Sequence, residues 1–213
     1  MRFPPLPVLP AALLAAAMVS AGAHAQDAAP PEMELRTYEL PREGVEPEIA
    51  PAGREELLDL LFERLLSASS KEESRAVEET IRGVWLDSGS ASIDLLMSRG
   101  FDALRDENYD RAYFYFDEVV TLAPDFAGGW DKRAAVHYIR EDYAEALRDI
   151  EQVLRLEPRH YQAMAGLGVI LEELGDKKGA LEAFRRALAL NPWLSDLTDR
   201  IAPLEREIEG RGI

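Results

Sequence analysis

The side chains best suited to catalysis or metal binding are scarce in this sequence. It contains three histidines, His24, His137 and His160, and no cysteine. Without a thiol there is neither a cysteine nucleophile nor a thiolate ligand for zinc. No two histidines are four residues apart, and the common hydrolase and nucleotide-binding motifs are absent. The sequence therefore predicts no catalytic residue, no cofactor and no metal site, and we expect packing or surface roles for the histidines.

Acidic residues form a local cluster at Asp102, Asp106, Glu107 and Asp110. Their spacing does not match a calcium-binding loop, so the cluster is interpreted as a solvated turn. Over the whole chain of 213 residues, 40 Asp and Glu outnumber 24 Lys and Arg, and the net charge is -16. Such a charge repels nucleic acid and anionic membrane surfaces, so we expect neither as a partner.

The first 25 residues have the pattern of a secretory signal sequence. Arg2 precedes an apolar stretch at residues 11–19, and Ala23-His24-Ala25 forms an A-x-A cleavage site. We expect cleavage between Ala25 and Gln26, with export to the periplasm or out of the cell. The apolar stretch is too short for a membrane span; the alternative is an uncleaved anchor. Residues 26–53 carry seven acidic and two basic side chains, which predicts a disordered, Pro-rich linker.

The most informative pattern is a period of 34 residues. This interval separates Pro124, Pro158 and Pro192, each of which ends a similar phrase: LAP, LEP or LNP. This period fits a repeated pair of helices. Small side chains let the two helices of a pair approach closely, large side chains fill the space between them, and the proline ends the second helix of the pair. Five further columns recur with the same spacing: Leu96/Trp130/Met164, Gly100/Ala134/Gly168, Ala112/Ala146/Ala180, Phe116/Ile150/Phe184 and Leu122/Leu156/Leu190.

In these columns the chain resembles the tetratricopeptide repeat (TPR), whose pattern is W-x2-L-G-x2-Y, then A-x3-F, then P. The resemblance implies an all-α fold, a right-handed α-solenoid of helix-turn-helix repeats at residues 93–126, 127–160 and 161–194. Arg99 and Arg133 depart from the pattern, since the family prefers Leu in that column. The short polar side chains predicted to N-cap the second helices are Asn108, Asp142 and Asp176.

Helical patterns flank the repeats on both sides. Residues 54–90 are predicted to form a degenerate, capping helix pair, with helices at residues 55–66 and 71–86. Ser70 and Glu73 predict a capping box at the start of the second helix. Residues 195–213 are predicted to form a C-terminal capping helix, in which Pro203 implies a kink or a restart.

The resemblance also indicates where a partner would bind, because the first helix of each repeat lines the concave face in this family. Some TPR domains hold a peptide's C-terminal carboxylate with Lys and Asn in these columns, and this chain has no such clamp. It has an apolar groove centre instead, which suits a hydrophobic peptide or an amphipathic helix. The alternative is that the chain's own helix at residues 55–66 fills the groove. The predicted groove residues are Met97, Phe101, Ala135, Tyr138 and Val169.

These patterns together predict a non-catalytic protein–protein interaction scaffold of the cell envelope. Its partner is expected to be a protein or a peptide, whose identity the sequence does not specify. Two alternatives stay open: a structural module through which copies of the chain associate into homo-oligomers, and an accessory regulator of an envelope enzyme.

Overall fold

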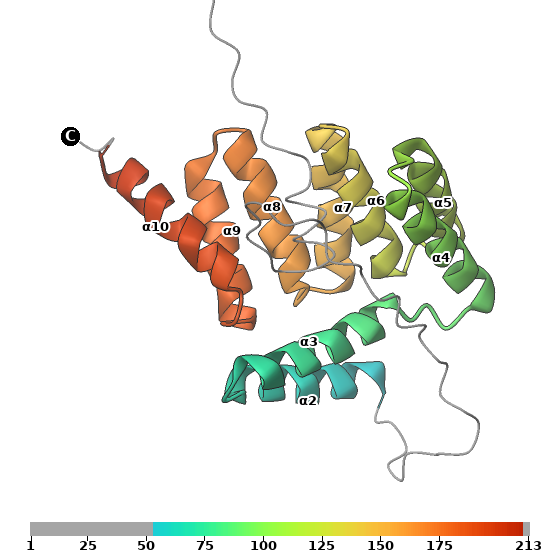
Figure 1. The fold of residues 1–213 in the computed structure, drawn as a ribbon, viewed down its shortest axis with the longest axis horizontal. Helices are drawn as coiled ribbons and strands as arrows, with labels where there is room; N and C mark the ends of the chain where they lie inside the picture. Colours follow the sequence, from blue (N-terminus) through green and yellow to red (C-terminus); the bar gives the residue numbers. More distant parts are fainter. Residues whose placement is uncertain (1–52, 211–213) are drawn as a thin grey trace, which may run out of the picture.

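The computed structural model describes residues 53–210, and within that range the chain is helical with no strand (Figure 1). Three helix pairs stack side by side, α4 with α5, α6 with α7 and α8 with α9, which confirms the predicted all-α solenoid. The predicted signal sequence and residues 26–52 of the predicted linker lie outside the described residues. The helices are α2 (Arg54–Ser67), α3 (Lys71–Leu86), α4 (Ala91–Arg105), α5 (Tyr109–Leu122), α6 (Ala127–Ile139), α7 (Tyr143–Leu156), α8 (Tyr161–Glu173), α9 (Lys177–Leu190) and α10 (Ser195–Gly210).

The two helices of each pair touch where the sequence places a small residue opposite a large one. A Cβ atom at Gly100 would lie 2.4 Å from the Phe116 ring, and one at Gly168 would lie 2.4 Å from the Phe184 ring. The middle pair has Ala134 in the glycine column, and its side chain is buried. Close backbone approach at these points is what the small-residue column predicts.

The turn inside each pair uses a residue with positive φ, and these residues are again 34 positions apart. They are Glu107 with φ 54°, Glu141 with φ 62° and Gly175 with φ 81°. Glycine adopts this left-handed conformation without steric cost, whereas a residue with a Cβ atom is strained there. The first two turns therefore hold a conformational cost that the third avoids.

All three residues predicted as N-caps stand at the N-cap positions of α5, α7 and α9, and two of them form the cap hydrogen bond. The side-chain oxygen of Asn108 accepts a hydrogen bond from the Arg111 N–H at 3.1 Å, and that of Asp176 accepts from the Gly179 N–H at 3.0 Å. Asp142 also stands at the N-cap position of α7, as predicted, but its side chain does not make the expected cap hydrogen bond. Its carboxylate is turned towards His137 instead, 3.8 Å from Nδ1.

Helices α2 and α3 form an antiparallel pair, which we call the N-terminal hairpin (residues 54–86). Its interior contains buried apolar side chains from both helices, among them Phe62 of α2 and Trp85 of α3. Ser70 caps α3 as predicted, accepting from the Glu73 N–H at 3.1 Å. The Glu73 carboxylate accepts from the backbone and hydroxyl of Ser69, one residue before the partner that a capping box would use.

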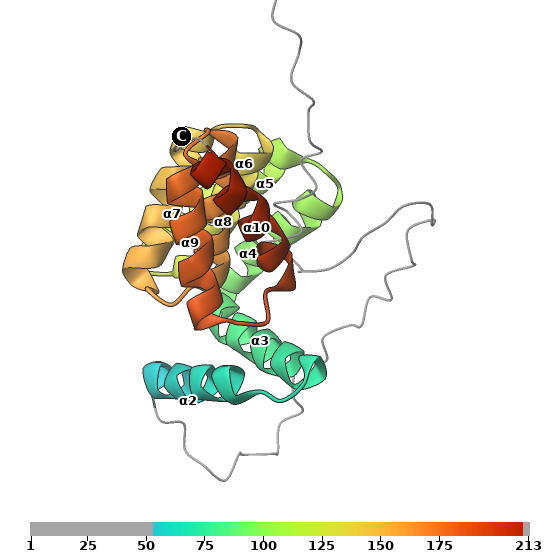
Figure 2. The ribbon, with the colours of Figure 1, turned by 90° about the vertical axis from the view of Figure 1, so that its left-hand side faces the viewer.

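The hairpin lies across one edge of the stack and does not extend it (Figures 1 and 2). Trp85 stacks on His160 at a centroid distance of 4.0 Å, and Phe62 meets Tyr161 edge-on at 6.2 Å. Both partners, His160 and Tyr161, stand at the start of α8, so α3 passes beneath the N-terminal end of this helix. The alternative in which residues 55–66 fill the inner groove does not match this position.

Polar contacts surround the aromatic centre of this docking contact. They are Arg54–Glu157 at 3.2 Å, Arg159–Asp59 at 2.5 Å and Asn191–Glu78 at 3.0 Å.

Repeat columns explain why the hairpin does not stack on α4. Asp102 occupies the column of Val136 and Ile170, which are fully buried against the preceding pair. Leu95, more than half exposed, occupies the column of Gly129, whose Cβ would lie 2.6 Å from Val119 of α5. A carboxylate and a bulky side chain thus stand where a stacked helix would require an apolar residue and a small one, so the outer face of α4 stays in water.

At the other end of the stack, α10 packs on α9 through the buried side chains of Leu197 and Leu204. Its ion pairs reach back to the repeats, from Glu205 to Arg185 at 2.6 Å and from Arg200 to Glu172 at 2.7 Å. The helix runs through Pro203 as one element, so the predicted restart at this proline is not present.

Candidate functional site

The predicted groove residues lie on the three inner helices α4, α6 and α8. Met97, Ala135, Tyr138 and Val169 are each less than one tenth exposed, whereas Phe101 is half-buried. The structure divides them between two apolar clusters. Met97 and Phe101 pack with Phe116 in the first repeat, while Ala135, Tyr138 and Val169 belong to the larger core that joins the second and third repeats to the N-terminal hairpin and α10.

Phe101 and Tyr138 are the two aromatic members of this set. The Phe101 ring meets Phe116 edge-on at 5.9 Å, which leaves its other side partly open. Tyr138 lies 5.7 Å from the ring of Tyr143. Burial, together with the nearby Glu173 carboxylate, raises the pKa of Tyr138 to about 12, so the phenol keeps its proton at any physiological pH.

His160 and Asp131 are buried beside the docked hairpin and influence one another electrostatically, which the sequence does not predict. His160 has a pKa lowered to about 4 because it is buried, and its Nδ1 accepts a hydrogen bond from the Ala163 N–H at 3.1 Å. A neutral ring thus caps the start of α8 and stacks on Trp85. Asp131 stands close enough to act on His160, and its carboxylate is 2.6 Å from the Lys132 ammonium.

The electrostatics of Asp131 are those of a buried ion. Burial alone would raise the pKa of this carboxyl, but Lys132 and His160 outweigh that effect and lower it. The 34-residue period places Asp131 on an inner helix, but nothing in the sequence indicates that the side chain of His160 lies near it.

Arg133, which departs from the family pattern, forms an ion-pair network between the first and second repeats. Its guanidinium lies 2.6 Å from Asp117 of α5 and 2.7 Å from Asp149 of α7, and it sits over the Trp130 ring at 4.8 Å. Hydrogen bonds to Asp149 raise the pKa of Arg133 further above its ordinary value. The arginine therefore replaces an apolar contact with a charged one at the same junction.

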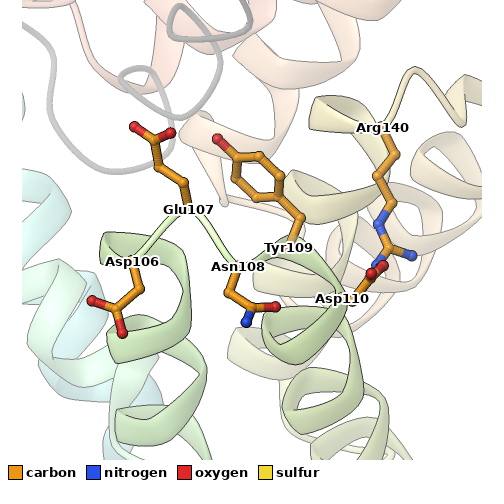
Figure 3. Close-up of a pocket in the computed structure, with 6 residues that line it drawn as sticks. All are labelled: Asp106, Glu107, Asn108, Tyr109, Asp110 and Arg140. Atoms are coloured by element: carbon orange, nitrogen blue, oxygen red, sulfur yellow. The ribbon is translucent and has the colours of Figure 1, made fainter.

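The acidic cluster forms an open hollow of about 470 Å³ at the turn between α4 and α5, shown in Figure 3. The carboxylates of Asp106 and Glu107 point in different directions, and Asp110 pairs with Arg140 at 2.5 Å. Within residues 53–210 no group of three His, Asp or Glu side chains could hold a metal ion. The geometry fits the interpretation of this cluster as a solvated turn.

None of the helices between residues 53 and 210 combines the length and the apolar character needed to cross a bilayer.

Comparison with known proteins places these features in a family. The tetratricopeptide-repeat family model matches residues 132–192. A TPR repeat-containing protein of Rhizobium etli is 32% identical over 166 residues, which cover 78% of this chain and 81% of that protein. The small glutamine-rich tetratricopeptide repeat-containing protein 2 of Saccharomyces cerevisiae is 26% identical over 125 residues, 59% of this chain and 36% of that protein.

Solved structures share the fold at low sequence identity. The first TPR domain of Spaghetti (RPAP3), bound to an HSP90 peptide, superimposes with a TM-score of 0.53 at 18% identity, covering 55% of this chain and 93% of that one. A chain of a T3SS complex from Aeromonas hydrophila gives a TM-score of 0.52 at 18% identity, covering 63% and 98%. With the similarity to the Rhizobium protein over most of both chains, these findings show that the chain belongs to the tetratricopeptide-repeat family.

Proposed function

We propose that this protein is a non-catalytic scaffold that binds a peptide or amphipathic segment of another protein along the inner face of its repeats. The observation that carries the proposal is the stack of three TPR helix pairs, whose inner helices α4, α6 and α8 present side chains to one face. A solved TPR domain with this fold carries an HSP90 peptide, which supports the same class of function for this chain.

The exposure of the five predicted groove residues indicates which of them would contact a ligand directly. Phe101 is the member of the predicted set that is partly exposed, so we assign direct contact to its ring. Met97 lies beneath it in the same cluster, and Ala135, Tyr138 and Val169 shape the inner face further along. Large aromatic side chains at the centre of an interface contribute about 2 kcal/mol or more to binding.

Self-association is a second candidate, supported by exposed apolar side chains on the N-terminal hairpin. Leu60 is 58% exposed and Leu66 is 55% exposed on α2. Light scattering during size-exclusion chromatography distinguishes the two functions, because a scaffold with a free inner face runs as a monomer at micromolar concentration.

We further propose that the scaffold works in the cell envelope after cleavage between Ala25 and Gln26. The apolar stretch at residues 11–19 and the A-x-A site support this location. The intact mass of the protein from the envelope fraction tests it, since the exported form should begin at Gln26. A full-length chain found in the cytoplasm would contradict export.

Crosslinking and pull-down from the cell envelope, with the chain that begins at Gln26, test the binding proposal. Phe101→Ala should keep its helical circular dichroism and lose the captured partner. Phe114→Ala is the matched control, because Phe114 is 57% exposed on the outer helix α5. If both variants capture the same proteins as the parent, the inner face does not carry binding.

A further inference from the structure

The end of the stack opposite α10 is formed by the outer sides of α4 and α5, and we call this surface the first face (Figure 1). Among the described helices α4 packs mainly on α5, and its outer side is exposed. A hollow of about 400 Å³ lies between the two helices, and the rest of its lining is two small residues. The large and charged side chains that line it are Leu95, Arg99, Asp102, Asp106, Arg111 and Tyr115.

The first face carries both signs of charge in nearly equal number. Hydrogen bonds from Arg111 and Arg99 lower the pKa of the Tyr115 hydroxyl, so both guanidinium groups stand beside this ring. Neither arginine makes an ion pair with a residue between 53 and 210. The Asp102 carboxylate is 3.1 Å from the guanidinium of Arg105, one turn further along α4, and both side chains are more than half exposed.

The residues that α4 contributes to this face follow helical spacing. Steps of four, three and four residues separate them, which places them in one row along the helix: Leu95, Arg99, Asp102 and Asp106. We consider a second copy of α4 antiparallel to this row, with a two-fold axis midway between residues 100 and 101. Arg99 then faces Asp102 of the second copy, and the symmetry repeats this ion pair on the other side of the axis.

A ligand with charge of one sign suits the first face less well than a second copy does. An acidic or a basic peptide that is attracted to two of the charged side chains is repelled by the other two. A second copy presents the same charges in reverse order, so each sign meets the opposite one. Elsewhere 40 Asp and Glu against 24 Lys and Arg make two copies repel one another, and the nearly balanced first face is where they can approach.

We propose that two copies of this chain associate head to head through the first face, with their α4 helices antiparallel about a two-fold axis. Exposed apolar surface at Leu95, which is 55% exposed, becomes buried in this contact. One helix from each copy makes a small interface, so we expect a transient dimer with a dissociation constant of about 100 µM. The protein is then a monomer at micromolar concentration.

This association goes beyond the proposed scaffold function and uses a different surface from the exposed leucines of α2. Phe101 projects from another side of α4 than the row of Arg99 and Asp102, so the inner face stays free in the dimer. A dimer therefore presents two inner faces, and a partner with two binding segments gains avidity from them.

A charge swap tests the proposal in sedimentation equilibrium of the chain that begins at Gln26. Arg99→Asp places carboxylates opposite one another at both ion pairs, and Asp102→Arg does the same with guanidinium groups. Each variant alone should dimerise about tenfold more weakly than the parent. An equal mixture of the two variants should regain the affinity of the parent, because each copy then meets the opposite charge at both pairs.

Two controls keep the result specific to the first face. Arg75→Asp makes the same change of charge at an exposed position of α3 and should dimerise like the parent. Leu60→Asp changes a leucine of α2 that is 58% exposed and should also dimerise like the parent. If Leu60→Asp abolishes the dimer instead, the hairpin is the interface and the proposal is wrong.

Three further results would overturn the proposal. The first is a parent that stays monomeric at about five times the expected dissociation constant. The second is an unchanged affinity in both single variants. The third is a mixture that associates no more tightly than the single variants do. Phe101→Ala should dimerise like the parent, so failure of this proposal is distinguishable from failure of the inner-face proposal.

Discussion

The repeats and the N-terminal hairpin are built from the same unit, two antiparallel helices, but different contacts hold them in place. Each repeat joins its helices by a small residue against a large ring, as at Gly168 and Phe184, and stacks on its neighbour in register. The hairpin meets the stack at one aromatic cluster around Trp85, surrounded by exposed ion pairs. Periodic packing holds each repeat to the next, whereas the hairpin is held by one local contact, through which its apolar core continues into that of the second and third repeats.

Buried polar atoms without a hydrogen-bond partner occur in both parts of the molecule. Within residues 53–210 they are Trp85 Nε1 and Arg82 Nε in the hairpin, Tyr161 Oη in its docking surface, and Asp131 Oδ1 and His137 Nδ1 in α6, so three of the five belong to the hairpin or its docking surface. A buried polar atom without a partner costs about 1–3 kcal/mol. We therefore expect the hairpin to open before the stack unfolds.

Removing the Trp85 ring should have the largest effect of any single substitution on this contrast. Trp85 is 2% exposed, and Trp→Ala in such a site costs about 3–5 kcal/mol. In hydrogen exchange, Trp85→Ala should lose protection in α2 and α3, while α5 to α7 keep theirs. An equal loss of protection in all helices would show that hairpin and stack are one cooperative unit, and the distinction between them would fail.

Acid should act on the same contact. The folded protein holds the pKa of His160 near 4, below the ordinary value of 6.5, because the buried ring resists protonation. The unfolded chain therefore binds the proton first, so stability is complete above pH 6.5 and is lost as pH falls towards 4. The loss should reach about 3 kcal/mol for this group.

His160→Asn isolates this effect, since Asn still accepts the hydrogen bond at the start of α8 but does not titrate. Urea unfolding at several pH values should give a flatter profile for this variant than for the parent. Parallel profiles would mean that His160 is not buried neutral against Trp85.

Inside the stack, a larger side chain at the point where α8 crosses α9 should overpack the contact between these two helices. Gly168→Leu forces new atoms into the Phe184 ring and should destabilise the protein by about 1–3 kcal/mol. Gly210→Leu is the control, because no atom lies within 4 Å of a Cβ built there. Equal melting temperatures for the two variants would contradict the assigned repeat register.

The smallest effect is expected at the turns. Glu141→Gly relieves a residue held at φ 62° and should stabilise the protein by about 0.5 kcal/mol, after the greater freedom of glycine in the unfolded chain is subtracted. Gly175→Ala places a Cβ atom at φ 81° in the third repeat and should destabilise it by about 1 kcal/mol. Thermal unfolding measures both, and the same sign for the two variants would rule out strain as the cause.

The sequence predicts the stack well because its contacts repeat. The 34-residue spacing reveals two columns, one with Gly100 and Gly168 and the other with Phe116 and Phe184. In the structure each of these glycines packs against the phenylalanine of its own repeat, as expected. The position of the hairpin was not predictable, since Trp85 and His160 belong to no shared column and their contact joins residues 75 positions apart. The burial of four of the five candidate groove residues was also missed, because a column assigns a face to a residue but not its exposure.

Asp102 has a further consequence for the molecule as an assembly. Its column is filled by Val136 and Ile170 in the later repeats, and α10 occupies the opposite end. A stack whose first face matched its inner faces would accept the last face of another copy, and head-to-tail contacts that do not close into a ring grow into filaments. We expect the Asp102 carboxylate at the first face, together with α10 over the last, to disfavour this head-to-tail contact between copies.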